Sequence, residues 1–175
     1  MVARDNFFVK KVMNFEREEI NSQILSILQP AGFEIKQKQL EGITNVLNGV
    51  DTLCILPTGY GKSLIFQLLP TLMEKLEPGS KPILIVVSPL LSLIADQIAA
   101  ANRSPFGLKA CSVTDLDEKE KEKENFNMFV GTPEAWLSNK GKQFLSSNFV
   151  LSNAISIVVD EVHKVTWGSK DKKSD

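Results

Sequence analysis

The sequence predicts an α/β domain in which a parallel sheet carries helices on both faces. Continuous apolar runs alternate with stretches of helical periodicity. Strands that are buried on both faces read as such unbroken runs, and helices supply the crossovers that parallel pairing requires. The predicted strands are residues 52–56, 82–88, 110–113, 127–130 and 155–159, and the predicted helices between them are residues 63–76, 91–101 and 133–144.

Composition places the chain among ordinary globular proteins. Of its 175 residues, 43% are hydrophobic and 23% are charged, which excludes a wholly disordered, collagen-like or disulfide-scaffold chain. This length holds about one domain or one and a half. The 20 Lys and Arg residues balance 21 Asp and Glu residues. A contact with nucleic acid would therefore need a local basic surface or backbone N–H groups rather than net charge.

The cysteines and the hydropathy of the sequence indicate the cellular compartment of the protein. Cys54 and Cys111 are far apart, and His163 is the only histidine, so no zinc-ligand cluster is expected. Both cysteines are predicted to be buried thiols in a reducing compartment. The longest apolar stretch, residues 83–94, is shorter than the ~20 residues of a membrane span, and the charged N-terminus does not resemble a secretory signal. We expect an intracellular protein without membrane contact.

The segments before and after the main domain are simpler. Residues 1–31 are predicted to form a helical leader, because apolar residues recur at helical spacing until Pro30. Residues 32–168 form the main domain, which opens with a second helix over residues 38–47. The alternating charges of residues 117–124 predict a solvated surface segment, and residues 169–175 form a polar tail.

The sharpest functional signal lies between the predicted strand 52–56 and the helix that follows it. Residues 56–63 (LPTGYGKS) match the phosphate-binding pattern G-x-x-x-x-G-K-[ST] except at the first position, where leucine replaces glycine. Gly59 and Gly61 allow the backbone to approach phosphate closely. Successive N–H groups, including those of Thr58 and Tyr60, can then bind the anion.

The last two residues of this loop carry the charge and the metal ligand. Lys62 is predicted to reach the β- and γ-phosphates of ATP, and the Ser63 hydroxyl is predicted to bind Mg²⁺.

A second signal stands about a hundred residues downstream. Residues 155–163 (ISIVVDEVH) read as a buried strand that ends in two acids. Side chains at the carboxyl end of a parallel strand face the ligand crevice. Asp160 is predicted to hold Mg²⁺, and Glu161 is predicted to orient or deprotonate the attacking water. The other interpretation is that the two acids only begin a surface loop.

These residues resemble a known family. Residues 160–163 (DEVH) resemble the DExH box of superfamily 2 helicases. Residues 56–67 (LPTGYGKSLIFQ) are similar to motif I of the RecQ family, in which an apolar residue commonly stands first, although Tyr60 replaces a usual glycine. Residues 88–97 (SPLLSLIADQ) resemble RecQ motif Ia, and residues 32–39 (GFEIKQKQ) resemble its motif 0.

The resemblance spans residues 32–168 and implies the P-loop NTPase fold of a first RecA-like domain. It implies a parent reaction in which ATP hydrolysis, with Mg²⁺, drives 3′-to-5′ movement on DNA. Gln39 would read the adenine edge through its amide, with Lys36 beside it where the family usually has arginine. Spacing alone favours a solvated helix residue at position 39.

The resemblance also implies a set of DNA contacts: Ser88, Pro89, Ser92, Thr132 and Trp167. Ordinary turn and cap chemistry is the alternative for the serines, and a core position is the alternative for the tryptophan. His163 would couple the ATP site to DNA, or it is a buried hydrogen-bonded side chain. The family match weakens beyond Trp167, where a polar sequence replaces the expected acidic and aromatic one.

The parent enzyme also needs a second RecA-like domain with an arginine finger, for which this sequence has no room. We therefore expect the chain alone to be weakly active or inactive as an ATPase and, as part of a DNA helicase, to be nuclear. Two alternatives stay open. One is a truncated ATP- or DNA-binding module without unwinding activity, and the other is an RNA-directed DExH or DEAD-box ATPase, against which residues 88–97 argue.

Overall fold

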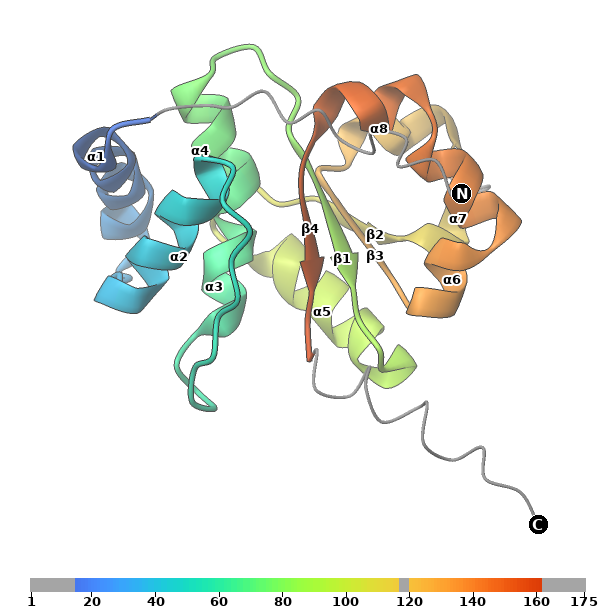
Figure 1. The fold of residues 1–175 in the computed structure, drawn as a ribbon, viewed down its shortest axis with the longest axis horizontal. Coiled ribbons are helices and arrows are strands. Elements are labelled where there is room, and N and C mark those ends of the chain that lie inside the picture. The colour runs from blue at the N-terminus through green and yellow to red at the C-terminus, as the bar shows by residue number, and fades with distance from the viewer. Residues whose placement is uncertain (1–14, 117–119, 162–175) are drawn as a thin grey trace, which may run out of the picture. The chain divides into compact units, whose positions relative to one another are not determined.

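The computed structural model describes residues 15–116 and 120–161 (Figure 1). The chain divides into two compact units, Met1–Pro82 and Ile83–Asp175, and each is described by itself. Within the described residues, no helix combines the length and apolarity needed to span a membrane.

The described part of the first unit is helical. Its elements are α1 (Arg17–Leu28), η1 (Gln29–Ala31), α2 (Gln37–Leu47), α3 (Lys62–Gln67) and α4 (Leu69–Leu76). Ile20, Ile24 and Leu28 recur at helical spacing along α1 and are fully buried, and α1 packs on α2 and α4. A helix is present in the described part of the predicted leader, and the helical stretch ends at Gly32, whose φ of 70° suits glycine.

The predicted helix 63–76 is present but divided. α3 ends at Gln67, and Leu68 is the residue between it and α4. Pro70 at the start of α4 has no N–H to donate to the carbonyl of Phe66, four residues earlier, so the regular ladder is interrupted there. The chain stays close to helical, because the N–H of Leu72 still bonds to the carbonyl of Leu68 over 2.9 Å.

The prediction of a strand over residues 52–56 is wrong for this structure. Leu53 and Ile55 are 73% and 83% exposed, and no described strand pairs with the segment. A strand exists only through its neighbours, so an apolar run without a paired neighbour stays irregular. The prediction that Cys54 is buried is also wrong, because the residue is exposed; its thiol nevertheless faces Gly42, and partial burial raises the pKa of Cys54.

The second unit is built on a parallel sheet. Its strands are β1 (Ile83–Val87), β2 (Ala110–Ser112), β3 (Met128–Gly131) and β4 (Ala154–Val159), in the order β2-β3-β1-β4. Every neighbouring pair is parallel, and the residues of β1 to β3 are almost all buried. The four strands predicted in this part of the sequence are confirmed, as is the buried position of Cys111, but the prediction that the strand before Asp160 is buried is wrong, because no residue of β4 is buried.

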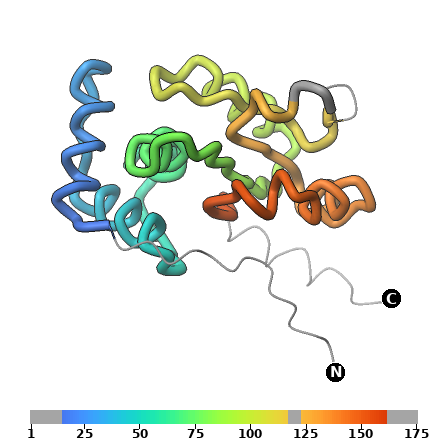
Figure 2. Tube along the Cα trace, turned by 90° about the horizontal axis from the view of Figure 1, so that it is seen from above, coloured from blue at the N-terminus to red at the C-terminus, as the bar shows by residue number. Residues whose placement is uncertain are grey.

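Helices cover both faces of this sheet, as the sequence predicts (Figure 2). The first of these helices, α5 (Leu91–Arg103), contacts β2 and β3, and the Asn102 side chain bonds both backbone groups of Ala110. On the other face, Phe129 of β3 stacks against Phe144 and Phe149, with ring centroids 4.7 and 6.2 Å apart. Those two rings come from α7 (Asn139–Leu145) and α8 (Asn148–Asn153).

The predicted helix 133–144 is likewise two helices, α6 (Pro133–Leu137) and α7. The hydroxyl oxygen of Ser138 accepts a hydrogen bond from the N–H of Gly141, which caps α7 and starts a new helix direction. Two short 3₁₀ turns, η2 (Val113–Asp115) and η3 (Glu120–Asn125), complete the unit.

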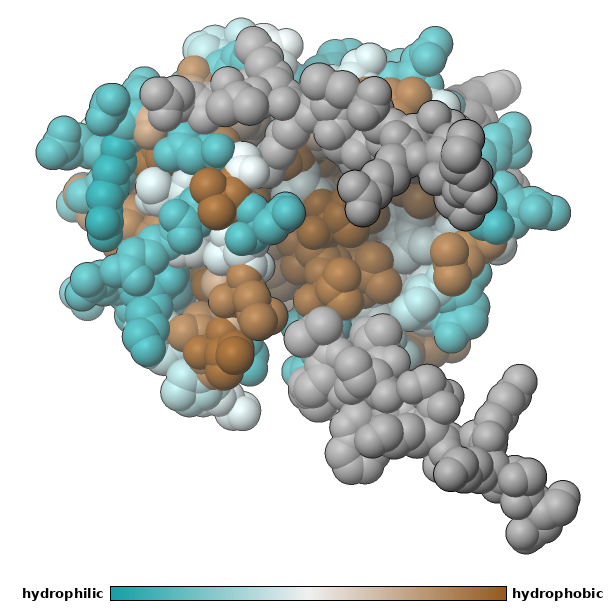
Figure 3. Space-filling model, in the orientation of Figure 1, coloured by the Kyte–Doolittle hydropathy of each residue, from teal (hydrophilic) through white to brown (hydrophobic). Residues whose placement is uncertain are grey.

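β4 is the last strand of the described sheet and is less covered than its neighbours. Ile157 and Val159 are 47% and 45% exposed. Ile157 pairs with Ile85, which in turn pairs with Phe129, so Ile157 shares the face on which the aromatic rings lie. Figure 3, in the orientation of Figure 1, shows apolar surface beside β4 within the second unit.

Candidate functional site

The loop that leads into α3 has the shape of an anion cradle. A tight turn joins its first residues, with the N–H of Tyr60 bonded to the carbonyl of Pro57 over 3.2 Å. Gly59 and Gly61 have φ values of 76° and 88°, which side-chain-bearing residues rarely adopt. Among the described residues, the N–H groups of both glycines donate to no other backbone group, so they stay available to an anion.

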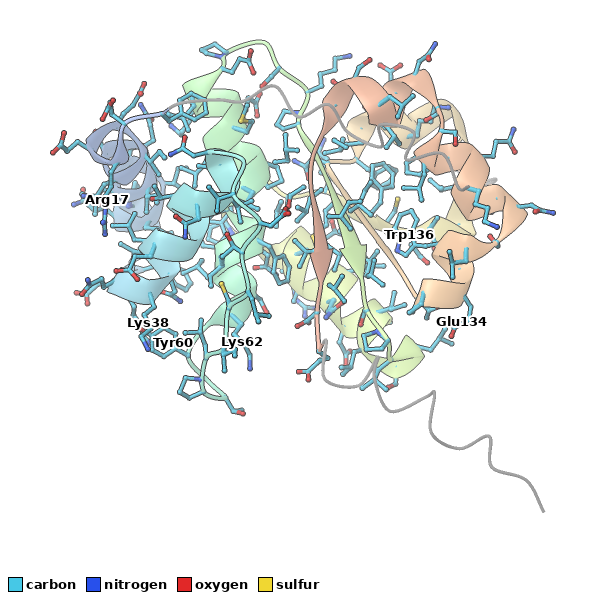
Figure 4. The ribbon with its side chains drawn as sticks, viewed as in Figure 1. Arg17, Lys38, Tyr60, Lys62, Glu134 and Trp136 are labelled. Carbon is cyan, nitrogen blue, oxygen red and sulfur yellow. The ribbon has the colours of Figure 1, made fainter. Side chains whose placement is uncertain are left out.

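Lys62 places its charge at this loop. Its Nζ atom donates a hydrogen bond of 3.2 Å to the carbonyl of Leu56, the residue at which the loop begins. The ammonium thus bridges the two ends of the loop. An ammonium has three donors, and within residues 15–116 and 120–161 only one of them is used, which leaves two for phosphate oxygens. Ser63, the next residue, is exposed. Figure 4 labels Tyr60 and Lys62, which both come from this part of the chain.

The side chain of Gln39, in the first turn of α2, is hydrogen-bonded to the loop of residues 56–63. Its side chain is only 2% exposed. Its Nε2 donates to the carbonyls of Tyr60 and Gly61, over 3.1 and 3.0 Å, and its Oε1 accepts from the N–H of Lys36 over 2.9 Å. Both hydrogens of the amide are therefore used within the protein. The prediction that Gln39 reads adenine stays a prediction, and it requires the amide to exchange these bonds for the base.

Lys36 and Tyr60 form a second attachment between α2 and the loop. The Nζ atom of Lys36 lies 4.4 Å from the centre of the Tyr60 ring and donates to the Tyr60 carbonyl over 3.2 Å. This cation–π contact depends on an aromatic side chain at position 60. The sequence predicts both residues near the nucleotide, but it does not predict their contact with each other.

The acidic pair follows β4 directly. The N–H of Asp160 extends the sheet by bonding to the carbonyl of Val87 over 3.0 Å. One carboxylate oxygen of Asp160 accepts from Nε2 of Gln97 over 2.8 Å, and the other accepts from the N–H of Glu161 over 2.9 Å. Glu161 has a φ of 50°, a left-handed conformation that costs a residue other than glycine ~1–2 kcal/mol. Each carboxylate oxygen keeps a lone pair for a cation.

Both parts fit the groups predicted to bind them. The loop offers free N–H groups and an ammonium, which suit the phosphates of ATP, and Asp160 offers carboxylate oxygens, which suit Mg²⁺. No cluster of three or more His, Cys, Asp or Glu side chains occurs among the described residues. Mg²⁺ needs none, because it is commonly held by one or two protein oxygens together with phosphates and water.

The predicted DNA contacts fall into two groups. Ser92 is exposed near the start of α5, and Pro89 is half-buried just before it. Ser88 is fully buried, and its hydroxyl has no hydrogen-bond partner among the described residues. Thr132 is 7% exposed, and its hydroxyl oxygen caps α6 by accepting from the N–H of Ala135. Ser92 is therefore the most accessible of the four, and all four contacts stay predictions.

His163 and Trp167 lie outside the described residues. Sequence reasoning missed one residue that the structure brings to the acidic pair, namely Gln97. It lies inside the motif-like segment 88–97, yet its partner Asp160 is 63 residues away. Only the pairing of β1 with β4 brings the two together, so no local sequence signal identifies the contact.

Comparison with known proteins agrees with this site. The family model described as DEAD/DEAH box helicase matches residues 36–173. ATP-dependent helicase SGS1 of Saccharomyces cerevisiae is 30% identical over 162 residues, covering 86% of this chain and 11% of that protein. RecQ-like DNA helicase blm-1 of Caenorhabditis elegans is 30% identical over 163 residues, covering 86% of this chain and 16% of that protein.

A bacterial relative is similar to the same extent. Probable ATP-dependent DNA helicase RecS of Bacillus subtilis is 30% identical over 155 residues, which cover 82% of this chain and 28% of that protein. The chain thus spans between about a tenth and less than a third of these relatives. The family match covers the phosphate-binding loop and the acidic pair alike, and the relatives agree with the RecQ resemblance of the motifs. The chain belongs to the DEAD/DEAH box helicase family.

Proposed function

We propose that this chain is the ATP-binding part of a RecQ-like ATP-dependent DNA helicase, which in its full-length context hydrolyses ATP to move 3′-to-5′ on DNA and unwind it. The family match and the DNA helicase relatives support the proposal. The observation that carries it is the loop of residues 56–63, where two glycines with positive φ stand beside a lysine whose ammonium reaches across the loop.

The proposed roles follow from the groups that each residue presents. Thr58, Gly59, Tyr60 and Gly61 bind phosphate oxygens through their N–H groups, and Lys62 binds the β- and γ-phosphates as a point charge. Ser63 and Asp160 hold Mg²⁺, which neutralises charge that develops on the phosphates. Glu161 orients the attacking water and accepts its proton. His163 relays the state of this site toward DNA.

The partners in this proposal are DNA and a second RecA-like domain. Ser92 and its neighbours offer hydroxyl and backbone donors to the phosphates of a single strand, and Trp167 offers a stacking face. The second domain supplies an arginine finger, which is worth about 10³–10⁵ in rate. We also propose an intracellular, nuclear location, which the eukaryotic DNA helicase relatives support and which imaging of a fluorescent fusion would test.

Titration with a fluorescent ATP analogue and Mg²⁺ tests the nucleotide site. A hydrogen bond to a charged group contributes about 1.5–3 kcal/mol, so Lys62→Ala should weaken binding by about 10–100-fold. Lys75→Ala is the matched control, because Lys75 is an exposed lysine of α4 in the same unit. Equal affinity in the wild type and Lys62→Ala would refute the assignment of Lys62.

A further inference from the structure

Gln97 is the side chain through which α5 touches the acidic pair. It lies on the helix that follows β1, and Asp160 lies just after β4, the neighbour of β1 in the sheet. The bond from Gln97 Nε2 to the Asp160 carboxylate is 2.8 Å long and charge-assisted, which makes it stronger than a neutral hydrogen bond. With the N–H of Glu161 on the other oxygen, it fixes the rotation of the Asp160 carboxylate.

The other end of the Gln97 amide is unused. Its Oε1 atom is buried and accepts no hydrogen bond from any described residue. A buried acceptor without a partner is unfavourable, and such atoms are rare in folded proteins. A neighbouring residue, Glu161, is held in a left-handed conformation that also costs free energy. Two unfavourable features thus stand beside one carboxylate, a pattern typical of a binding site prepared for a ligand.

We infer that Gln97 is a positioning residue for the metal site of the proposed function, on which this inference rests. Its Nε2 holds the Asp160 carboxylate in the orientation that a divalent cation needs, and its Oε1 accepts a hydrogen bond from a water molecule on that cation. Partners of this kind, which orient a ligand without touching the metal, typically change metal affinity by about 10–100-fold when removed.

The competing explanation is that Gln97 only stabilises the packing of α5. A structural role would lower stability without changing how much a divalent cation improves nucleotide binding. The measurement is therefore the gain in affinity for a fluorescent ATP analogue when Mn²⁺ replaces a chelator, taken together with thermal unfolding of the full chain. In Gln97→Met, which keeps the length of the side chain and removes its amide, this gain should fall about tenfold, while the metal-free affinity stays unchanged.

A matched control and a double-mutant cycle make the test specific. Gln143→Met makes the same chemical change at an exposed position of α7 and should keep the full Mn²⁺ gain. In an Asp160→Asn background, Gln97→Met should cause no further loss, because Gln97 acts through the Asp160 carboxylate. Losses that simply add in the double variant would overturn the inference.

A second variant guards against a folding defect in Gln97→Met. Gln97→Glu keeps the shape of the side chain but replaces the donated hydrogen bond with a second negative charge beside Asp160. A Mn²⁺ gain equal to or larger than that of the wild type in this variant would overturn the positioning role. If the wild type gains nothing from Mn²⁺, the metal assignment of Asp160 fails as well, whereas a normal wild-type gain retained in Gln97→Met rejects Gln97 alone.

Discussion

The side chain of Gln39 donates a hydrogen bond to Gly61 and also fills the space that a side chain at position 61 would need. Nε2 of Gln39 lies 3.0 Å from the carbonyl oxygen of Gly61, and a Cβ atom added to Gly61 would lie 2.7 Å from the same nitrogen. The glycine is therefore required twice, once for its φ of 88° and once for the space that Gln39 fills. The shape of the phosphate-binding loop thus depends on a side chain from α2.

Substituting the two loop glycines should separate these requirements. Gly59→Ala should cost only the conformational free energy of an alanine at positive φ, about 1–2 kcal/mol, because no atom lies within 4 Å of the added Cβ. Gly61→Ala should have the same conformational cost and should also displace the Gln39 side chain. It should therefore weaken binding of an ATP analogue more strongly than Gly59→Ala does. Fluorescence titration of both variants gives the comparison, and equal losses would contradict the role of Gln39 in shaping the loop.

The same reasoning predicts a rescue. In a Gln39→Ala background the Cβ atom of an alanine at position 61 has no amide to displace. Gly61→Ala should then cost about the same as Gly59→Ala, rather than more. The measurement is the affinity of the double variant relative to Gln39→Ala alone.

Gln39→Ala also decides how the nucleobase is selected. Because the amide holds the loop through two carbonyls, its loss should weaken ATP and GTP binding together, by up to about 5–150-fold, since each net hydrogen bond contributes ~0.5–1.5 kcal/mol. Competition between the two nucleotides measures both affinities. A loss confined to ATP, which narrows its preference over GTP, would instead support direct reading of adenine by the amide.

Gly141→Ala should destabilise the second unit. A Cβ atom at this position would collide with the backbone carbonyl of Ala135 and lie 2.5 Å from that of Trp136, and backbone atoms cannot move aside as a flexible side chain does. Overpacking of this kind typically costs about 1–3 kcal/mol. Urea unfolding should show the loss, while Lys142→Ala, at the exposed neighbouring position in α7, should leave the midpoint nearly unchanged.

The polypeptide of residues 1–175, tested by itself, should not unwind DNA. In the proposed function, translocation requires a cleft that closes between this domain and a second RecA-like domain. Its single-strand binding should be weak, because the proposed contacts are mostly hydroxyl and N–H donors and the net charge is −1, and it should fall with salt, because these contacts are made to the charged phosphates of the strand. Strand displacement and a binding titration at two salt concentrations provide the readouts. ATP-dependent strand separation, or tight binding that ignores salt, would refute this expectation.

The sequence predicted best what local patterns determine. The apolar runs at β1, β3 and β4 are continuous rather than alternating, which favours a parallel sheet between helices, so the sheet and its strands were predictable. Ser138 and Ser147 are residues of the type that caps helices, and they cap α7 and α8; a cap at Ser138 is the local signal that divides the predicted helix 133–144.

Features that depend on distant neighbours could not be predicted in the same way. Residues 52–56 have a strand-like composition, but a strand forms only where another strand accepts its hydrogen bonds. The contact between Gln97 and Asp160 follows from the adjacency of β1 and β4 in the sheet, which periodicity does not encode. The loop and the acidic pair were recognisable because each is a short contiguous motif next to one element.

The exposed side of β4 also affects the tendency of the purified polypeptide to self-associate in solution. Among the described residues β4 has a strand neighbour on one side only, and it carries the half-exposed side chains Ile157 and Val159. An apolar edge strand is a template for pairing with another chain. Self-association through this edge would increase with protein concentration. It would cause precipitation, or it would raise the apparent unfolding temperature without any change in the stability of the monomer. The binding titrations and unfolding experiments should therefore use dilute protein and should be repeated at several protein concentrations.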